Sequence, residues 1–371
     1  MNNNTVVSTL AVAATQPVTP FPPSPASLPA RALKLALDVH LQEHVVAMQY
    51  DGSVPKPPQR FSPPALLAWV QKQRAQGWNV ISCYEAGPFG YGLHRQLTAL
   101  GVTNYVIRPR DWDAEHKQVK TDRTDARAML TALDRFVAGN RHALAVVRVP
   151  TEAEERLRTE SRLRQSLRKD LKRLTQRGRG VALQYGYRLK GCWYGPRRWP
   201  HLQIPDWLVT LLTPLQAAAS ALRCLIQQQT AQIERQSTAP RPKGLGKLTE
   251  QVLTREICDP NRFHNRRQVS SYLGLCPGEH SSGVRQQRGS ITKAGNPRLR
   301  GALIEAAWRL VRFQPDYRLC KKWRAQLLDA RTGLGRRKQL LVALARGFGV
   351  DWWRLQTGQT TAEKLGLVLA E

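Results

Sequence analysis

Short apolar runs that alternate with helically spaced apolar residues between positions 33 and 137 predict an α/β domain. Four of these runs are short and continuous, as is typical of buried strands, and the first two lie close enough together to form a hairpin. The expected strands cover residues 33–39, 44–48, 79–84 and 105–107. Helical spacing predicts helices over residues 64–74, through Leu93 and Leu97, and from Asp122 towards Phe136.

A different pattern begins near residue 151, where leucines at helical spacing stand among many charged residues. Ten lysines or arginines between residues 151 and 180 predict a long, solvated helix or coiled-coil arm. A second long helix is expected over residues 205–233, and Pro214 should kink it or split it in two. Residues 237–243, with two prolines, are typical of a linker.

These changes of pattern predict five segments along the chain. The first thirty residues are rich in Asn, Thr, Ser and Pro, a composition that predicts disorder. We expect a disordered tail at residues 1–30, an α/β domain at 31–150, a helical coiled-coil region at 151–237, a mainly helical C-terminal domain at 238–350 and a C-terminal tail at 351–371.

Charge indicates the class of partner. The chain of 371 residues carries 57 Lys and Arg against 27 Asp and Glu, a formal net charge of +30. Such an excess indicates a polyanion, of which nucleic acid is the commonest and an anionic membrane surface the weaker alternative. No apolar run of about 18 residues is present, which argues against a spanning helix. The lack of Lys or Arg before Arg31 argues against a secretory signal, and six scattered cysteines without a Cys-x-x-Cys pair favour a reducing cytoplasm.

Four acidic residues form the first candidate site. Asp122 and Asp125 are three residues apart, so a helix places them on one face, although such a pair alone is more often a simple helix start. Asp38 and Glu85 end two of the predicted strands, and the carboxyl ends of parallel strands meet at one edge of a sheet. Four carboxylates gathered there would suit Mg²⁺ or Mn²⁺, which in pairs promote phosphoryl transfer. The alternative is four unrelated acids at separate loop ends.

The second candidate site is a polar, glycine-punctuated loop in the last third of the chain, followed by a basic helix. Backbone amides at glycines, together with Arg and Lys, can cradle a phosphate. A serine held there could attack a phosphodiester, although most serines in such loops are turn or capping residues. The residues expected to contact nucleic acid are Arg285, Arg288, Lys293, Asn296, Arg298 and Arg300.

Two groups of aromatic residues are weaker candidates. Tyr185, Trp193 and Trp199 lie among arginines and lysines, an arrangement that suits either RNA binding or simple anchoring of a loop. Trp352 and Trp353 could stack on bases, but a helix-packing role is the stronger interpretation.

Both candidate sites, in this order, resemble the DEDD-type insertion-sequence transposases, a family of bridge-RNA-guided recombinases. Residues 120–126, which read Lys-Thr-Asp-Arg-Thr-Asp-Ala, and residues 84–86, Tyr-Glu-Ala, match that family's acidic motifs. Residues 36–38 read Ala-Leu-Asp where Gly-x-Asp is usual. Residues 273–296 are similar to the family's serine-bearing transposase domain, and residues 244–246, Gly-Leu-Gly, resemble the motif that opens it.

The resemblance, which covers about residues 33–350, implies specific roles. It implies a ribonuclease-H-like, RuvC-like fold for the α/β domain, and Mg²⁺ held by Asp38, Glu85, Asp122 and Asp125. It further implies that Ser282 attacks DNA to form a covalent phosphoserine link, with the adjacent Ser281 left as an alternative. The implied partners are double-stranded DNA at the element ends and target, a structured guide RNA, and further copies of the chain in a dimer or tetramer. No membrane partner is implied, and the expected location is the bacterial cytoplasm, in association with the nucleoid.

Two other classes of function stay open from the residues alone. One is a metal-dependent, junction-resolving nuclease that uses only the four carboxylates, with Ser282 in a structural role. The other is a non-catalytic nucleic-acid-binding protein whose acids are ordinary surface residues.

Overall fold

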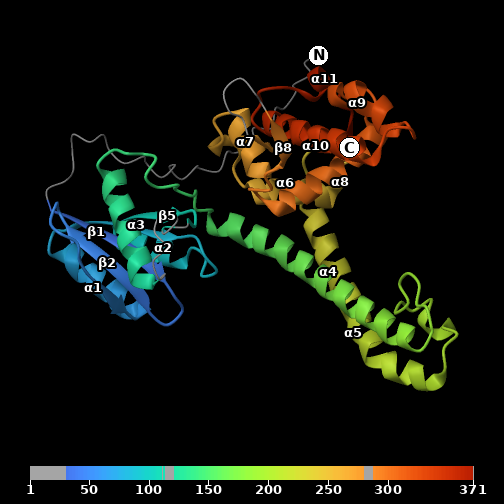
Figure 1. The fold of residues 1–371 in the computed structure, drawn as a ribbon, viewed down its shortest axis with the longest axis horizontal. Coiled ribbons are helices and arrows are strands. Elements are labelled where there is room, and N and C mark those ends of the chain that lie inside the picture. Colours follow the sequence, from blue (N-terminus) through green and yellow to red (C-terminus); the bar gives the residue numbers. More distant parts are fainter. Residues whose placement is uncertain (1–30, 111, 113–120, 280–286, 371) are drawn as a thin grey trace, which may run out of the picture. The chain divides into compact units, whose positions relative to one another are not determined.

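A computed structural model describes residues 31–110, 112, 121–279 and 287–370 of the chain (Figure 1). The chain divides after Val149 into two compact units. The first unit is a mixed five-stranded sheet with helices, and the second is mainly helical. This confirms the expected α/β region followed by helices.

The sheet of the first unit has the order β3-β2-β1-β4-β5. Its first two strands pair as an antiparallel hairpin, which confirms that prediction, whereas β4 and β5 run parallel to β1. The strands are β1 (Ala32–Val39), β2 (His44–Tyr50), β3 (Lys56–Phe61), β4 (Asn79–Glu85) and β5 (Thr103–Ile107).

Strand β3 is an element that the sequence pattern did not predict. It carries two prolines and is mostly exposed, so it has neither the apolar run nor the alternation of a buried strand. Proline lacks an N–H donor and is confined to the edges of sheets, and β3 is an edge strand, paired only with β2.

Helices cover both faces of the sheet. Alternate residues of β1, Leu33, Leu35 and Leu37, pack on the side of α1 (Pro63–Ala75) and α2 (Gly92–Ala99). The residues between them face α3 (Asp122–Val137): Ala36 belongs to the core that contains the apolar side of α3, and buried Lys34 donates to Asp134 of that helix. Every second residue of β1 is therefore directed towards α3, which determines where Asp38 lies.

The second unit begins with two long helices packed as an antiparallel hairpin. They are α4 (Glu152–Gln184) and α5 (Asp206–Arg235), which agree with the two predicted long helices. A capping box at Thr151 and Glu154 starts α4, and Arg164 of α4 donates to Thr230 of α5 at 2.6 Å. Pro214 lies inside α5, which continues through it as one helix.

Aromatic residues anchor the loop at the tip of this hairpin, which includes η2 (Trp199–His201). Trp193 is fully buried, and a Cβ placed at Gly178 of α4 would lie 2.2 Å from its ring. Glycine is therefore required at position 178. Tyr194 is also buried, whereas Tyr185 is exposed and packs edge-on against Trp207. Most of the aromatic cluster thus serves packing.

One helix of the described part of the chain, α5, is long and apolar enough to cross a membrane by length and composition. Only 11% of its most apolar stretch of 18 residues is buried. Its partner α4, however, carries ten lysines and arginines, which would be costly in hydrocarbon. Helix α5 is therefore part of a hairpin arm with an exposed apolar side. Trp207, Leu211 and Leu225 belong to that side.

The remaining helices of the second unit enclose one apolar core. They are α6 (Lys247–Ile257), η3 (Pro260–Arg262), α7 (Arg266–Leu273), α8 (Pro297–Phe313), α9 (Arg318–Leu328), α10 (Leu334–Gln356) and α11 (Ala362–Leu365). Two short antiparallel pairs join β7 (Pro277–Glu279) to β8 (Arg288–Ile291) and β6 (Arg241–Pro242) to β9 (Leu369–Ala370).

Residues 351–370 do not form the expected tail. Trp352, Trp353, Leu365 and Leu367 are all buried in this core, and the last strand pairs with the segment expected to be a linker. The burial of both tryptophans agrees with the packing interpretation and leaves neither ring free to stack on a base.

A buried carboxylate joins three helices of the second unit. The side chain of Glu256 on α6 has no exposed surface, and it accepts hydrogen bonds from Arg162 of α4 at 2.9 and 2.8 Å and from Asn296 before α8 at 2.8 Å. Arg158 and Arg298 lie within 4.0 Å of the same carboxylate. Burial alone would raise the pKa of Glu256, but these hydrogen bonds and charges outweigh it and hold the pKa below its usual value.

We expect Glu256→Gln to lower the free energy of unfolding of the second unit by about 3 kcal/mol, because it leaves partly buried arginines without their buried counter-charge. Thermal unfolding followed by calorimetry measures the change. Asp316→Asn is the matched control, since it breaks an exposed ion pair with Lys321 and should cost less than about 1 kcal/mol. Equal losses in both variants would contradict this role for Glu256.

Comparison of the wild type with Glu256→Gln also gives a prediction for the pH dependence of stability. A carboxyl group whose pKa is lowered in the folded state stabilises the fold above its unfolded pKa of about 4.3. That stabilisation is lost as the pH falls through the folded-state pKa. The difference in melting temperature between the wild type and Glu256→Gln should therefore shrink as the pH is lowered from 7 towards 3, and a constant difference would refute the assignment.

Candidate active site

Asp38 and Glu85 lie side by side because of the strand register. In the parallel pairing of β1 with β4, Leu37 is opposite Tyr84, so the two acids are the next residues along adjacent strands. Asp38 continues the series of Lys34 and Ala36 on the face covered by α3, and Glu85 continues that of Ile81 and Cys83. The two carboxylates therefore leave the same edge of the sheet on the same face, as the sequence predicted.

The other two acids come from the start of α3 on that face. Thr121 caps the helix by accepting a hydrogen bond from the backbone N–H of Thr124, at 3.3 Å. Asp122 is the first residue of the helix, and Asp125 is half-buried on the same side one turn later. The apolar side of α3 begins at Ala126 and packs on the sheet, which directs this first turn towards the strand ends.

The structure adds one residue that the sequence pattern did not single out. The Nε2 atom of His40 lies 3.2 Å from Oδ2 of Asp38 and 3.6 Å from Oδ2 of Asp122. One ligand atom from each of these three residues lies within 4.8 Å of the others, close enough together to hold one metal ion. The available signal was the spacing Asp-x-His, because residues two apart in extended chain point the same way.

The charges of the acids act on one another. Burial raises the pKa of Asp38, His40 lowers it, and the negative charges of Asp122 and Glu85 raise it. Glu85 also raises the pKa of the Cys83 thiol, although burial is the larger cause there. Mutual repulsion of this kind is relieved by a cation, so the group is electrostatically suited to one.

Glu85 is held in place by residues that follow β5. Its Oε1 atom accepts a hydrogen bond from the backbone N–H of Arg110 at 3.1 Å and another from Nε1 of Trp112 at 2.6 Å. Two donors on one carboxylate oxygen fix the orientation of the side chain and leave the second oxygen for a ligand.

The donor set fits a divalent cation. Carboxylate oxygens are the ligands that Mg²⁺ and Mn²⁺ prefer, and an imidazole nitrogen is also acceptable to Mn²⁺ and other transition metals. Asp38, Asp122 and His40 would bind the ion directly, with Glu85 close enough for its charge to act on Asp38. Such a site could stabilise the negative charge that develops on a phosphate during displacement.

The second predicted site lies partly outside the described residues. Ser281, Ser282 and Arg285 belong to residues 280–286, and of Arg288 only the backbone, in β8, is described. Two described glycines on either side of those residues pack tightly together, since a Cβ at Gly295 would lie 2.5 Å from the backbone N of Gly274. A side chain at position 295 would therefore clash with this backbone.

Two of the six residues expected to contact nucleic acid make side-chain hydrogen bonds to other parts of the protein. Asn296 caps α8 through its Oδ1 atom and donates to Glu256 through Nδ2. Arg298 donates to Gln165 of α4 at 2.8 Å. Lys293 is exposed, and Arg300 donates to the Lys293 carbonyl at 3.2 Å. Among the described side chains of this group, Lys293 and Arg300 are thus the better placed for a phosphate.

Comparison with known proteins identifies the family of the chain. Residues 241–321 match the model of the Transposase IS116/IS110/IS902 family. Putative transposase y4rJ of Sinorhizobium fredii is 32% identical over 307 residues, which cover 74% of this chain and 76% of the relative. The transposase for insertion sequence element IS1111A of Coxiella burnetii is 26% identical over 291 residues, or 72% of this chain and 75% of that protein. The chain therefore belongs to the IS116/IS110/IS902 family of transposases, enzymes that catalyse phosphoryl transfer on DNA.

Proposed function

We propose that the protein is an RNA-guided DNA recombinase that moves an insertion sequence through a serine–DNA intermediate, with its RuvC-like α/β unit supplying a Mg²⁺ site. The observation that carries this proposal is the convergence of Asp38, His40 and Asp122, with Glu85 adjacent, at one sheet edge of a chain that belongs to a transposase family. The strand order, with parallel strands next to an antiparallel hairpin, supports the RuvC-like assignment.

The proposed chemistry exchanges one phosphodiester for another. The Oγ atom of Ser282 forms a bond to a DNA phosphorus while the bond from that phosphorus to a deoxyribose oxygen breaks. The serine proton is lost, and the leaving oxygen becomes a hydroxyl. A deoxyribose hydroxyl of the recombining strand then attacks the phosphoserine and releases Ser282. No external energy source is needed, because the number of phosphodiester bonds is conserved.

The acids and the serine have distinct tasks. Asp38, Asp122, Asp125, Glu85 and His40 hold and orient the cation at the edge of the sheet. When bound, Mg²⁺ supplies positive charge to the non-bridging phosphate oxygens. Lys293 and Arg300 bind the flanking phosphates, consistent with the basic composition of the chain.

The guide RNA and the oligomer belong to the same proposal. A net charge of +30 suits a protein that binds RNA and DNA together. The exposed apolar side of α5, with Trp207, Leu211 and Leu225 each about half exposed, supports association of two hairpins in a dimer or tetramer.

A specific observation also favours a second candidate, the metal-dependent nuclease. The acid cluster by itself contains the groups that metal-assisted hydrolysis needs, so cleavage without a serine intermediate is chemically coherent. The two mechanisms differ in whether DNA becomes covalently attached to the protein.

We expect Asp122→Asn to weaken Mn²⁺ or Mg²⁺ binding and to reduce strand exchange, each at least about tenfold, because it removes a charged ligand. Calorimetric titration and a strand-exchange assay measure the two effects. Glu43→Gln is the control: it removes a nearby carboxylate whose side chain pairs with Arg60 outside the cluster. Unchanged metal binding in Asp122→Asn would exclude this site, and absence of exchange in the wild type with any divalent ion would favour a non-catalytic binding protein.

Ser282→Ala should abolish the covalent protein–DNA adduct, while Ser281→Ala should retain it, because only the first substitution removes the proposed nucleophile. Labelled DNA that stays with the protein under denaturing conditions detects the adduct. The reverse result would assign the nucleophile to Ser281. A variant that carries both Ser281→Ala and Ser282→Ala gives the remaining test. If it cleaves DNA as fast as the wild type and forms no adduct, the carboxylates act alone, as in the nuclease alternative.

A further inference from the structure

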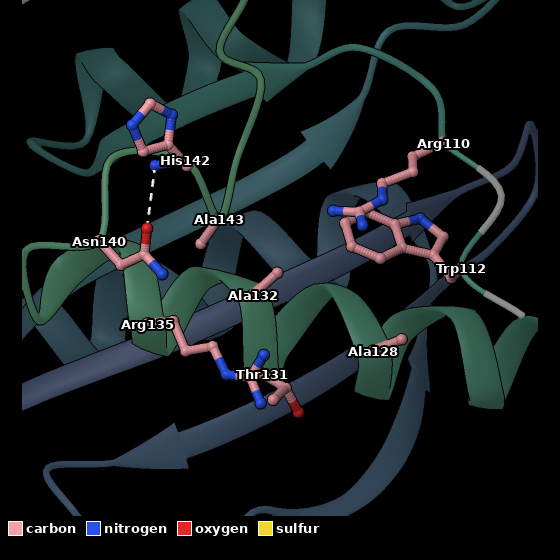
Figure 2. Close-up of a pocket in the computed structure, with 9 residues that line it drawn as sticks. All are labelled: Arg110, Trp112, Ala128, Thr131, Ala132, Arg135, Asn140, His142 and Ala143. Atoms are coloured by element: carbon pink, nitrogen blue, oxygen red, sulfur yellow. Dashed lines mark hydrogen bonds between the residues drawn. The ribbon is translucent and has the colours of Figure 1, made fainter. Parts of the chain in front are cut away.

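A basic hollow with an aromatic wall lies on the first unit (Figure 2), and two of its lining residues bind Glu85. It encloses about 320 Å³ between α3, the segment after α3 and the segment after β5. Its polar side chains include Arg110, Thr131, Arg135, Asn140 and His142, and its aromatic side chain is Trp112. Among the described residues that line it, none is acidic.

The walls combine positive charge with flat π surfaces. The guanidinium of Arg110 lies 5.5 Å from the centroid of the Trp112 ring, and the indole is half-buried against the core beneath α3. Arg135 is exposed on α3, and Figure 2 shows His142 and Asn140 closing one end, where the backbone N–H of His142 donates to Asn140. Aromatic and guanidinium planes beside exposed cations are the groups that proteins use to bind unpaired nucleotides.

The hollow is physically joined to the candidate active site. Arg110 and Trp112, which line it, are the two residues whose N–H groups bind the Glu85 carboxylate. The indole N–H thus binds Glu85, beside the acid cluster, while the ring forms the wall of the hollow. A strand whose phosphate lies at the acids would have a neighbouring nucleotide within reach of this wall.

We propose that this hollow binds one unstacked nucleotide of a nucleic-acid strand, with its base on the Trp112 and Arg110 planes and its phosphate near Arg135. The proposal rests on the function proposed above, since it places that nucleotide beside the reacting phosphate. The volume is at the small end of the range for ligand pockets, which suits a single nucleotide, and the open cationic rim suits a continuing strand. The base and phosphate chemistry is shared by DNA and RNA.

The test uses the full-length protein and a short labelled single strand, made once as DNA and once as RNA, with binding followed by anisotropy over a range of salt concentrations. Trp112→Ala should weaken binding roughly five- to 100-fold, the loss expected for one stacked base. Trp112→Phe should retain most of the affinity because it keeps an aromatic ring, although it loses the donor to Glu85. A larger loss for one of the two strands identifies the natural ligand.

Arg135→Gln tests the phosphate contact separately. It should lower the slope of log affinity against log salt by about 0.7, the value for one phosphate contact on a single strand. Arg127→Gln is the matched control, because Arg127 is an exposed arginine of the same helix that does not line the hollow. Photocrosslinking from a 4-thiopyrimidine base should mark the peptide that contains Trp112.

Wild-type affinity and salt slope in both Trp112→Ala and Arg135→Gln, with crosslinks elsewhere, would overturn the proposal. Calorimetric titration with Mg²⁺ keeps this outcome distinct from failure of the proposed function. If the hollow alone is wrong, both variants bind the strand as the wild type does, and Arg135→Gln, which makes no contact with the acids, also binds the metal as the wild type does. If the metal site is wrong, the wild type binds no Mg²⁺, although loss of strand affinity in the two variants would still support the hollow.

Discussion

The structure depends first on the parallel pairing of β1 with β4. One register shift of a single residue would turn either Asp38 or Glu85 to the opposite face of the sheet, because side chains alternate along a strand. The apolar residues on both faces prevent that shift, since each face is covered by a helix and a shift would bury polar groups. The core of the first unit thus fixes the geometry of the acid cluster.

A buried negative charge organises the second unit. Glu256 is buried and joined to arginines of α4 and to Asn296, so a carboxylate in a basic protein becomes the point at which three helices meet. Asn296 ends the motif that resembles the transposase domain and Arg298 lies in the basic helix that follows it, yet their side chains face this carboxylate and α4. A basic motif can therefore combine residues that hold the fold with others, such as Lys293, that stay exposed.

Charge is distributed unevenly over a chain whose net charge is +30. In the first unit Asp38, His40 and Asp122 lie close together, and the adjacent Glu85 accepts hydrogen bonds from Arg110 and Trp112. Opposite charges so close together fit the proposed function: the acids would hold a cation at the reacting phosphate, and the arginines would attract the neighbouring phosphates.

The sequence by itself determined the strands of the buried sheet, the long charged helices and the placement of Asp38, Glu85 and Asp122 at strand ends and a helix start. These features have local causes: apolar periodicity, capping residues and residue spacing. Only the tertiary structure decided that β3 completes the sheet despite two prolines, that His40 joins the acids, that residues 351–370 belong to the core, and that Asn296 faces inward. Each of these depends on partners distant in sequence or on the direction of a side chain across an interface, which no local pattern encodes.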